Sequence, residues 1–308
     1  MNKITLGKTN LVIEKNGFGC LPIQRISEQD AVNLLHKAYD GGINFFDTAR
    51  AYSDSEQKVG AAFSSMRDKI VLATKTGAQT AEEFWKDLET SLRTLKTDYI
   101  DIYQFHNPAF CPKPGGEDGL YDAALEAKKQ GKIRHISITN HRLTVAHEAI
   151  DSGLYETLQF PFSYLAGEQE MEQQDGVVPI WGVQRESELD QFLQCIREGV
   201  ELTDERKATI ERDRKELCGE FCRGCGYCMP CPAGIEINQC ARMSLMLRRA
   251  PAAAWLTEEW QQKMHQIENC RHCGHCMSKC PYGLNTPELL QANYKDYWEV
   301  LAASKAEK

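Results

Sequence analysis

Eight of the thirteen cysteines stand in two short runs, and these runs carry the clearest chemistry in the chain. The first reads C-R-G-C-G-Y-C-M-P-C-P, with Cys222, Cys225, Cys228 and Cys231; the second reads C-R-H-C-G-H-C-M-S-K-C-P, with Cys270, Cys273, Cys276 and Cys280. The second has the thiolate spacing of bacterial iron–sulfur proteins, and the first differs only in a last spacer of two residues. In that spacing the fourth cysteine, before a proline, binds the other cluster. We therefore predict two [4Fe–4S] clusters with crossed ligand sets: Cys222, Cys225, Cys228 with Cys280, and Cys270, Cys273, Cys276 with Cys231.

Two other chemistries use paired cysteines, and the pattern disfavours both. Structural zinc prefers two CxxC pairs separated by a loop and needs four ligands in all. Here each run holds four cysteines and ends in Cys-Pro, which zinc does not require. Disulfides are typical of exported proteins, whereas the stretch Met1 to Leu11 is polar and has no apolar signal region. The cysteine usage therefore predicts a reducing cytoplasm.

Four ionisable side chains at expected strand ends form a second candidate site. They are Asp47 and Tyr52 in N-F-F-D-T-A-R-A-Y, Lys75 in V-L-A-T-K-T and His106 in D-I-Y-Q-F-H. A free tyrosine has a pKa near 10, and a neighbouring ammonium group favours the phenolate and lowers that pKa. Together the four residues suit proton donation to a carbonyl: Tyr52 as general acid, Lys75 beside it, Asp47 holding the lysine and His106 orienting the substrate oxygen.

A repeated order of apolar strand, polar turn and amphipathic helix must position these side chains. Ser27 with Asp30, and Thr80 with Glu83, resemble helix N-caps, and further helices end at Gly131, Gly153 and Gly199. Alternating strands and helices favour a (β/α) barrel, in which functional groups gather at the carboxyl ends of the strands. The seven expected strands are Gly17–Ile23, Ile43–Asp47, Ile70–Lys75, Tyr99–His106, Ile133–Thr139, Leu158–Tyr164 and Val177–Val183.

One connection is too short for a complete barrel. Only twelve residues, L-A-G-E-Q-E-M-E-Q-Q-D-G, separate Tyr164 from Val177, and a crossover between parallel strands needs about a dozen at minimum. A closed barrel of this type has eight strands. The sequence therefore predicts an incomplete, seven-stranded TIM-type barrel.

The rest of the chain divides by composition. Residues 1–200 hold the barrel pattern, and the charged stretch 201–217 is helix-prone. Residues 218–308 contain both cysteine runs, two expected helices between them, and a last helix that starts at Thr286. The net charge of −8 and pI near 5.6 exclude an electrostatic footprint for nucleic acid or an anionic membrane, and no apolar stretch is long enough to span a bilayer.

The order Asp, Tyr, Lys, His on successive strand ends resembles the aldo-keto reductase family. F-D-T-A-x-x-Y and the following Y-S-D-S-E, Tyr52 to Glu56, are close to its motifs, and the resemblance covers roughly residues 1–200. The tail resembles the branch of this family that carries a dicluster ferredoxin-like domain. The resemblance implies NADPH, with Thr139, Asn140 and Gln159 at positions that hold the nicotinamide carboxamide. Arg185 could bind the 2′-phosphate, or be an ordinary exposed arginine.

Two functions follow from these features. The first is an oxidoreductase that reduces an aldehyde or ketone, or oxidises an alcohol, with clusters that relay electrons. A hydride carries two electrons whereas a cubane ordinarily accepts one, so the clusters would serve a redox partner, a flavoprotein or ferredoxin, or be structural. The second is an electron-carrier subunit whose incomplete barrel is a docking scaffold. The four catalytic candidates favour the enzyme; the missing unit, which the resemblance places where the family holds its cofactor, favours the carrier.

Overall fold

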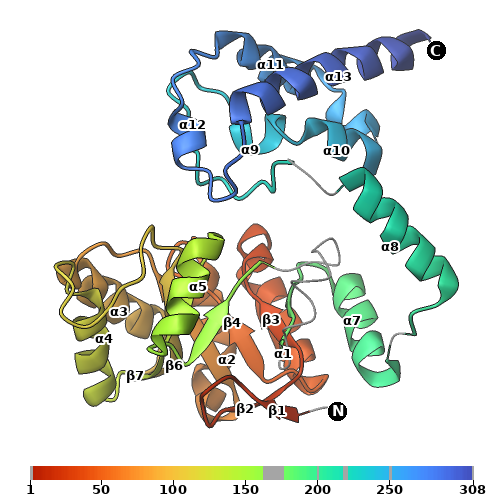
Figure 1. Ribbon diagram of the computed structural model, residues 1–308. Helices are drawn as coiled ribbons and strands as arrows, with labels where there is room; N and C mark the ends of the chain where they lie inside the picture. Colours follow the sequence, from red (N-terminus) through yellow and green to blue (C-terminus); the bar gives the residue numbers. More distant parts are fainter. Residues whose placement is uncertain (1–2, 162–176, 200, 218–220, 250–251, 307–308) are drawn as a thin grey trace. The chain divides into compact units, whose positions relative to one another are not determined.

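The computed structural model describes residues 3–161, 177–199, 201–217, 221–249 and 252–306, and divides the chain into two compact units, Met1–Thr203 and Asp204–Lys308 (Figure 1). The first unit holds the strands and the second is helical. The sequence predicts a barrel at 1–200, a connecting helix at 201–217 and a cluster domain from 218. That helix is present as α8 (Asp204–Leu217) and falls within the second unit.

Seven parallel strands form one open sheet in the first unit, in the order β8-β7-β6-β5-β4-β3-β9. The predicted number of strands is therefore confirmed, and among the described residues β8 and β9 form the two edges. The predicted residues 162–164 of one strand and the short connection 165–176 lie outside the described residues. The strands are β3 (Gly17–Gly19), β4 (Phe45–Asp47), β5 (Val71–Thr76), β6 (Ile100–His106), β7 (Ile133–Thr139), β8 (Thr157–Gln159) and β9 (Ile180–Gly182).

Helices cover the outer face of this sheet and follow the order of its strands (Figure 1). Their apolar faces pack against alternate strand residues; Phe46, for example, meets Phe63 of α2 with ring centres 4.4 Å apart. Ser27 and Thr80 cap α1 and α3 as predicted, each accepting a hydrogen bond from the backbone three residues on. The helices are α1 (Glu28–Asp40), α2 (Ser55–Phe63), α3 (Ala81–Leu95), α4 (Leu120–Lys129), α5 (Leu143–Ser152) and α7 (Glu186–Glu198), with short 3₁₀ turns η1 (Pro22–Arg25) and η2 (Ser64–Lys69).

A small second core fills the inner side of the sheet. Inward-facing Phe45, Val71, Ala73 and Ile102 pack together with Ile13 of the N-terminal hairpin. That hairpin consists of β1 (Lys3–Thr5) and β2 (Val12–Glu14), which pair antiparallel. These apolar side chains fill the inner side of the sheet at the amino-terminal ends of β4 and β5. The polar side chains of these strands that face inward lie at the carboxyl ends.

The second unit is built around the C-terminal helix α13 (Thr286–Ala306), which starts at the predicted residue and is buried at Leu290, Tyr297 and Leu301. Two helices were expected between the cysteine runs, and the structure has several shorter ones. Thr257 caps one of them and accepts a hydrogen bond from Trp260 N. They are α9 (Ile237–Cys240), α10 (Met243–Arg249), η3 (Ala252–Trp255), α11 (Glu258–His265) and η4 (Gln266–Asn269), followed by α12 (His275–Ser278). No helix of the described residues is long and apolar enough to cross a membrane.

Candidate active site and cluster pockets

The register of the sheet brings the polar strand-end residues together. Neighbouring strands align Asp47 with Ala73, Lys75 with Gln104 and His106 with Thr139, and Thr139 in turn with Gln159. Alternate residues of a strand point to the same face. The inward-facing series of β4, β5 and β6 therefore changes from apolar (Phe45, Ala73, Ile102) to polar (Asp47, Lys75, Gln104, His106) at the carboxyl ends. This is where a site in parallel α/β architecture is expected.

Lys75 and Asp47 form a buried ion pair at the centre of this site. Lys75 Nζ lies 2.5 Å from Asp47 Oδ1 and also donates to the Thr48 carbonyl oxygen at 2.7 Å. The two side chains are 1% and 4% exposed. Gln104 Nε2 donates to the second carboxylate oxygen of Asp47 at 3.0 Å. Asp47 therefore holds the lysine as predicted from the sequence, and a glutamine that the sequence reasoning had not singled out holds Asp47.

Tyr52 and His106 lie next to this pair. Their rings are 5.8 Å apart, centre to centre, in an edge-to-face arrangement. Lys75 Nζ is 5.1 Å from the centre of the Tyr52 ring. All four predicted catalytic residues thus converge, although they come from three strand ends and one loop.

The pKa of Tyr52 differs from the expectation. The neighbouring ammonium was expected to lower it; instead burial raises the pKa of the Tyr52 hydroxyl well above 10, and the negative charge of Asp47 adds to the effect. The reason is that the charge of Lys75 is already paired with Asp47, while the phenol has lost most of its contact with water. Tyr52 is therefore fully protonated at neutral pH, the state that a proton donor needs.

His106 is neutral at neutral pH for a similar reason. Burial lowers its pKa to about 3, with smaller contributions from the positive charges of Lys75 and His141. A neutral imidazole has one N–H donor and one acceptor nitrogen. It can thus hydrogen-bond a carbonyl oxygen without adding a net charge to the site.

The loop that carries Tyr52 is anchored at several points. Its backbone bonds to the end of β5, with Thr48 N donating to Ala73 O and Arg50 N to Lys75 O. The Arg50 guanidinium pairs with Glu56, a 1% exposed carboxylate at the start of α2 that also accepts from Thr74 and Ser91 at 2.7 Å each. Because Glu56 is buried, this contact fixes the loop to the sheet as well as to the helix.

The residues predicted to bind a nicotinamide cofactor differ in how well their surroundings suit that role. Gln159 donates weakly to Asp47 at 3.4 Å, and its Oε1 is buried with no hydrogen-bond partner among the described residues, so it could accept from an amide N–H. Thr139 is buried beside it at the same strand ends. Asn140 is already bonded, with its amide donating to Pro108 O and accepting from Arg142 N, both at 2.8 Å.

Arg185 differs from Gln159, Thr139 and Asn140 in its exposure. It stands at the N-terminus of α7 with a 70% exposed side chain, 3.6 Å from Glu188. The carboxylate of Glu188 in turn accepts from the backbone N–H groups of Gln184 and Arg185. An anion that bound here would compete with Glu188. Gln159 and Thr139 therefore fit a nicotinamide carboxamide, whereas Asn140 and Arg185 have other partners.

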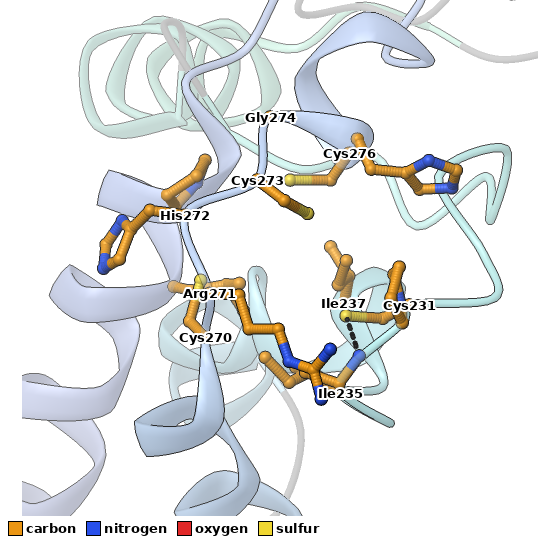
Figure 2. A pocket seen from close by; sticks show the side chains of 14 residues that line it. Cys231, Ile235, Ile237, Cys270, Arg271, His272, Cys273, Gly274 and Cys276 are labelled. Carbon is orange, nitrogen blue, oxygen red and sulfur yellow. Dashed lines mark hydrogen bonds between the residues drawn. The ribbon is translucent and has the colours of Figure 1, made fainter.

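The cysteines of the second unit gather around two hollows. One, of about 400 Å³, is lined by Cys270, Cys273 and Cys276 from the second run and by Cys231 from the first (Figure 2). The Sγ of Cys231 accepts a hydrogen bond from Ala233 N at 3.4 Å, the dashed line in Figure 2. The structure therefore brings one of the two predicted sets of four cysteines together.

The second hollow, of about 330 Å³, is lined by the other predicted set, Cys222, Cys225, Cys228 and Cys280. Burial, followed by the neighbouring Cys222 and Cys225, raises the pKa of the Cys228 thiol to about 12. Among the described residues, no three Cys, His, Asp or Glu side chains converge closely enough to hold a single metal ion. A four-iron cluster is bound through its corner irons, so its thiolates stand farther apart than the ligands of one zinc ion.

Comparisons with known proteins agree with both parts of this picture. Residues 3–171, more than half of the chain, match the model of the aldo/keto reductase family, and residues 221–285 match that of the 4Fe-4S dicluster domain. The uncharacterized oxidoreductase YqkF of Bacillus subtilis is 31% identical over 242 residues, which are 68% of this chain and 78% of that protein. L-galactose dehydrogenase of Arabidopsis thaliana is 32% identical over 178 residues, but the match covers only 54% of its length.

A solved structure shows the same fold as the first unit. It is an aldo/keto reductase from Klebsiella pneumoniae in complex with NADP and acetate, with a TM-score of 0.57 and 19% identity. The match covers 68% of this chain and 95% of that chain. At this identity the likeness is one of fold alone.

Proposed function

The chain belongs to the aldo/keto reductase family, and on this premise we propose that it reduces a small aldehyde or ketone, or oxidises the corresponding alcohol, with NADPH. The observation that carries the proposal is the buried Lys75–Asp47 pair beside a protonated Tyr52 and a neutral His106. A stable fold does not require these four side chains to lie side by side. As a set they supply a proton donor, a compensating charge and an orienting hydrogen bond.

In the proposed reaction Tyr52 donates its proton to the carbonyl oxygen of the substrate. His106 hydrogen-bonds the same oxygen and orients it. As the phenol loses its proton, the Lys75 ammonium stabilises the negative charge that develops, and Asp47 keeps Lys75 charged and in place. NADPH, when bound, supplies the hydride, and Gln159 and Thr139 would hold its carboxamide.

We further propose that the two cysteine hollows bind two [4Fe–4S] clusters with the crossed ligand sets. A cubane accepts one electron, so the clusters exchange electrons with a redox partner protein, such as a flavoprotein or ferredoxin, in single steps. The grouping of each set around its own hollow supports this assignment.

Replacement of the general acid tests the barrel's role. Tyr52→Phe removes the proton that is transferred but keeps the ring that packs against His106. Loss of a general acid costs on the order of 10²–10⁴ in rate, so kcat for a panel of small aldehydes should fall by that factor. The matched control, Tyr39→Phe, removes a hydroxyl from the surface of α1. Wild-type rates in Tyr52→Phe would refute the assignment.

A second candidate function, an electron carrier whose barrel is a docking scaffold, is favoured by two observations. The sheet is open between β8 and β9 in the described residues, and the α7 N-terminus is occupied by Glu188. Both features weaken nucleotide binding. Anaerobic calorimetry with NADPH and NADH separates the two functions: micromolar or tighter binding supports the enzyme, and no binding supports the carrier.

A further inference from the structure

The two stretches of sequence that hold the cysteine runs carry a charge opposite to that of the whole chain. The net charge is −8, yet residues 221–235 and 269–287, which contain all eight cluster cysteines, have no Asp or Glu. They contain three cations, Arg223, Arg271 and Lys279. We call these three side chains the basic rim.

The basic rim is exposed and unpaired. All three side chains are solvent-exposed, and none forms an ion pair with a carboxylate in the described part of the chain. Two other cations of the same unit differ: Arg248 lies 2.6 Å from Asp296, and Lys263 lies 3.0 Å from Glu259. The unpaired cations of the rim are thus concentrated where the clusters would be.

Two of the rim residues line a hollow, and the third adjoins a predicted cluster cysteine in the sequence. The Arg223 guanidinium stacks on Tyr282 at 4.2 Å, and both residues line the second hollow. Figure 2 shows Arg271 reaching along the side of the first hollow toward Ile235, while the ring of His272 points away. Lys279 directly precedes the ligand Cys280.

Some of the cluster cysteines beside these cations are themselves exposed. Cys225 and Cys273, one ligand from each predicted set, are exposed. Met277, between the second run's third and fourth cysteines, is an apolar side chain with 42% exposure. A partner that contacted these exposed residues would bring its redox centre close to a cluster.

We propose that the basic rim docks an acidic one-electron carrier protein, one whose own redox centre is surrounded by carboxylates. This inference rests on the proposed function, because the hollows must hold clusters. In each encounter the reduced carrier loses one electron and an oxidised cluster gains it; no proton moves and no covalent bond changes. Opposite charges steer such partners together and raise the rate of association by about 10–10³, an effect that salt suppresses.

A different role for the three charges is to balance the negative charge of the clusters themselves. That role and docking have separable consequences. Charge balance acts on the cluster potentials and so changes the rate with every reductant. Docking acts on association and so changes the rate with an acidic protein alone.

The test compares two triple variants of the full chain with reconstituted clusters. The rim variant is Arg223→Gln, Arg271→Gln and Lys279→Gln; the control, Lys207→Gln, Arg212→Gln and Lys295→Gln, removes three positive charges from α8 and α13. Stopped-flow absorbance follows cluster reduction by a ferredoxin of strongly negative net charge and by a zwitterionic viologen, over a range of salt concentrations. EPR-monitored titration gives the cluster potentials.

We expect the rim variant to react about tenfold or more slowly with the ferredoxin at low salt, with a smaller salt dependence. Its rate with the viologen and its potentials should match those of the wild type, and the control should resemble the wild type throughout. An unchanged ferredoxin rate overturns the proposal, as does an equal slowing with both reductants. Wild-type protein without bound iron would instead refute the clusters, a result that iron and sulfide analysis detects first.

Discussion

Removal of the Asp47 charge should lower the free energy of unfolding of the first unit. Asp47→Asn keeps the size of the side chain but leaves the Lys75 ammonium, 1% exposed, without a counter-ion. Breaking a buried pair by removing one partner costs about 3–5 kcal/mol, because an uncompensated charge stays buried. For a unit of this size, that corresponds to a fall in Tm of roughly 6–20 °C.

A double-mutant cycle separates the charge from the packing. Lys75→Met in the Asp47→Asn background removes the stranded ammonium and keeps an unbranched chain in its place. The double variant should therefore be more stable than Asp47→Asn alone, although it has lost one more native side chain. Buried pairs that contact each other deviate strongly from additivity.

Differential scanning calorimetry of the barrel transition measures these differences. Glu186→Gln is a matched control, since it makes a similar carboxylate-to-amide change at the exposed pair with Lys37 and should leave the transition in place. If Asp47→Asn unfolds within a degree or two of the wild type, or if the double variant loses the sum of the two single losses, the pair is not a buried, coupled unit and the reasoning is wrong.

Three further predictions address the loop, the imidazole and the clusters. Glu56→Gln should lower kcat by up to about 10²-fold, because Arg50 no longer fixes the loop of Tyr52 and small misplacements of catalytic groups have effects of this size. The cluster absorbance should stay unchanged. An unchanged kcat in steady-state kinetics would show that this anchor is irrelevant. The folded chain holds the pKa of His106 at about 3, below its ordinary 6.5, so the unfolded chain binds one more proton than the folded chain between these pH values. The free energy of unfolding should therefore be unaffected by His106 above pH 6.5 and should fall as the pH drops, less steeply in His106→Gln. Parallel acid-unfolding curves for the variant and the wild type would contradict this. Cys280→Ala should damage the cluster of Cys222, Cys225 and Cys228, and Cys231→Ala the other one; iron analysis and EPR that showed the reverse pattern would exclude the crossed sets.

Much of the candidate site was predictable from the sequence, because alternate residues of a strand point to the same face of the sheet. Asp47 and His106 each end an apolar strand, Lys75 is the last residue but one of β5, and parallel strands align their carboxyl ends. Gln104 was missed, although it stands two residues before His106 and a glutamine inside an apolar strand is itself a signal. The protonation of Tyr52 could not be read from sequence, since it depends on burial and on the prior pairing of Lys75.

The missed helix α2 has a different explanation. Its sequence, S-E-Q-K-V-G-A-A-F, contains Gly60 near the middle, which reads as a helix breaker. In the structure this glycine allows close packing: a Cβ at Gly60 would lie 2.6 Å from the Thr94 carbonyl oxygen and 2.8 Å from Leu95. Some strands also proved shorter than predicted, whereas β7 has the predicted bounds. β3 ends at Gly19, and the 3₁₀ turn η1 begins at Pro22, where proline favours the start of a helical turn.

The open sheet also has a consequence for how the first unit folds. β9 pairs only with β3 in the described residues, through Gly17–Ile180, Phe18–Trp181 and Gly19–Gly182. β3, the first parallel strand of the chain, thus pairs along this edge with a strand that is synthesised more than 150 residues later. Contacts so far apart in sequence form late and open first. Amides of β9 should exchange with deuterium ahead of those of β5 and β6, and the indole of Trp181, which donates to Asn16, reports the docking of this last strand by its fluorescence.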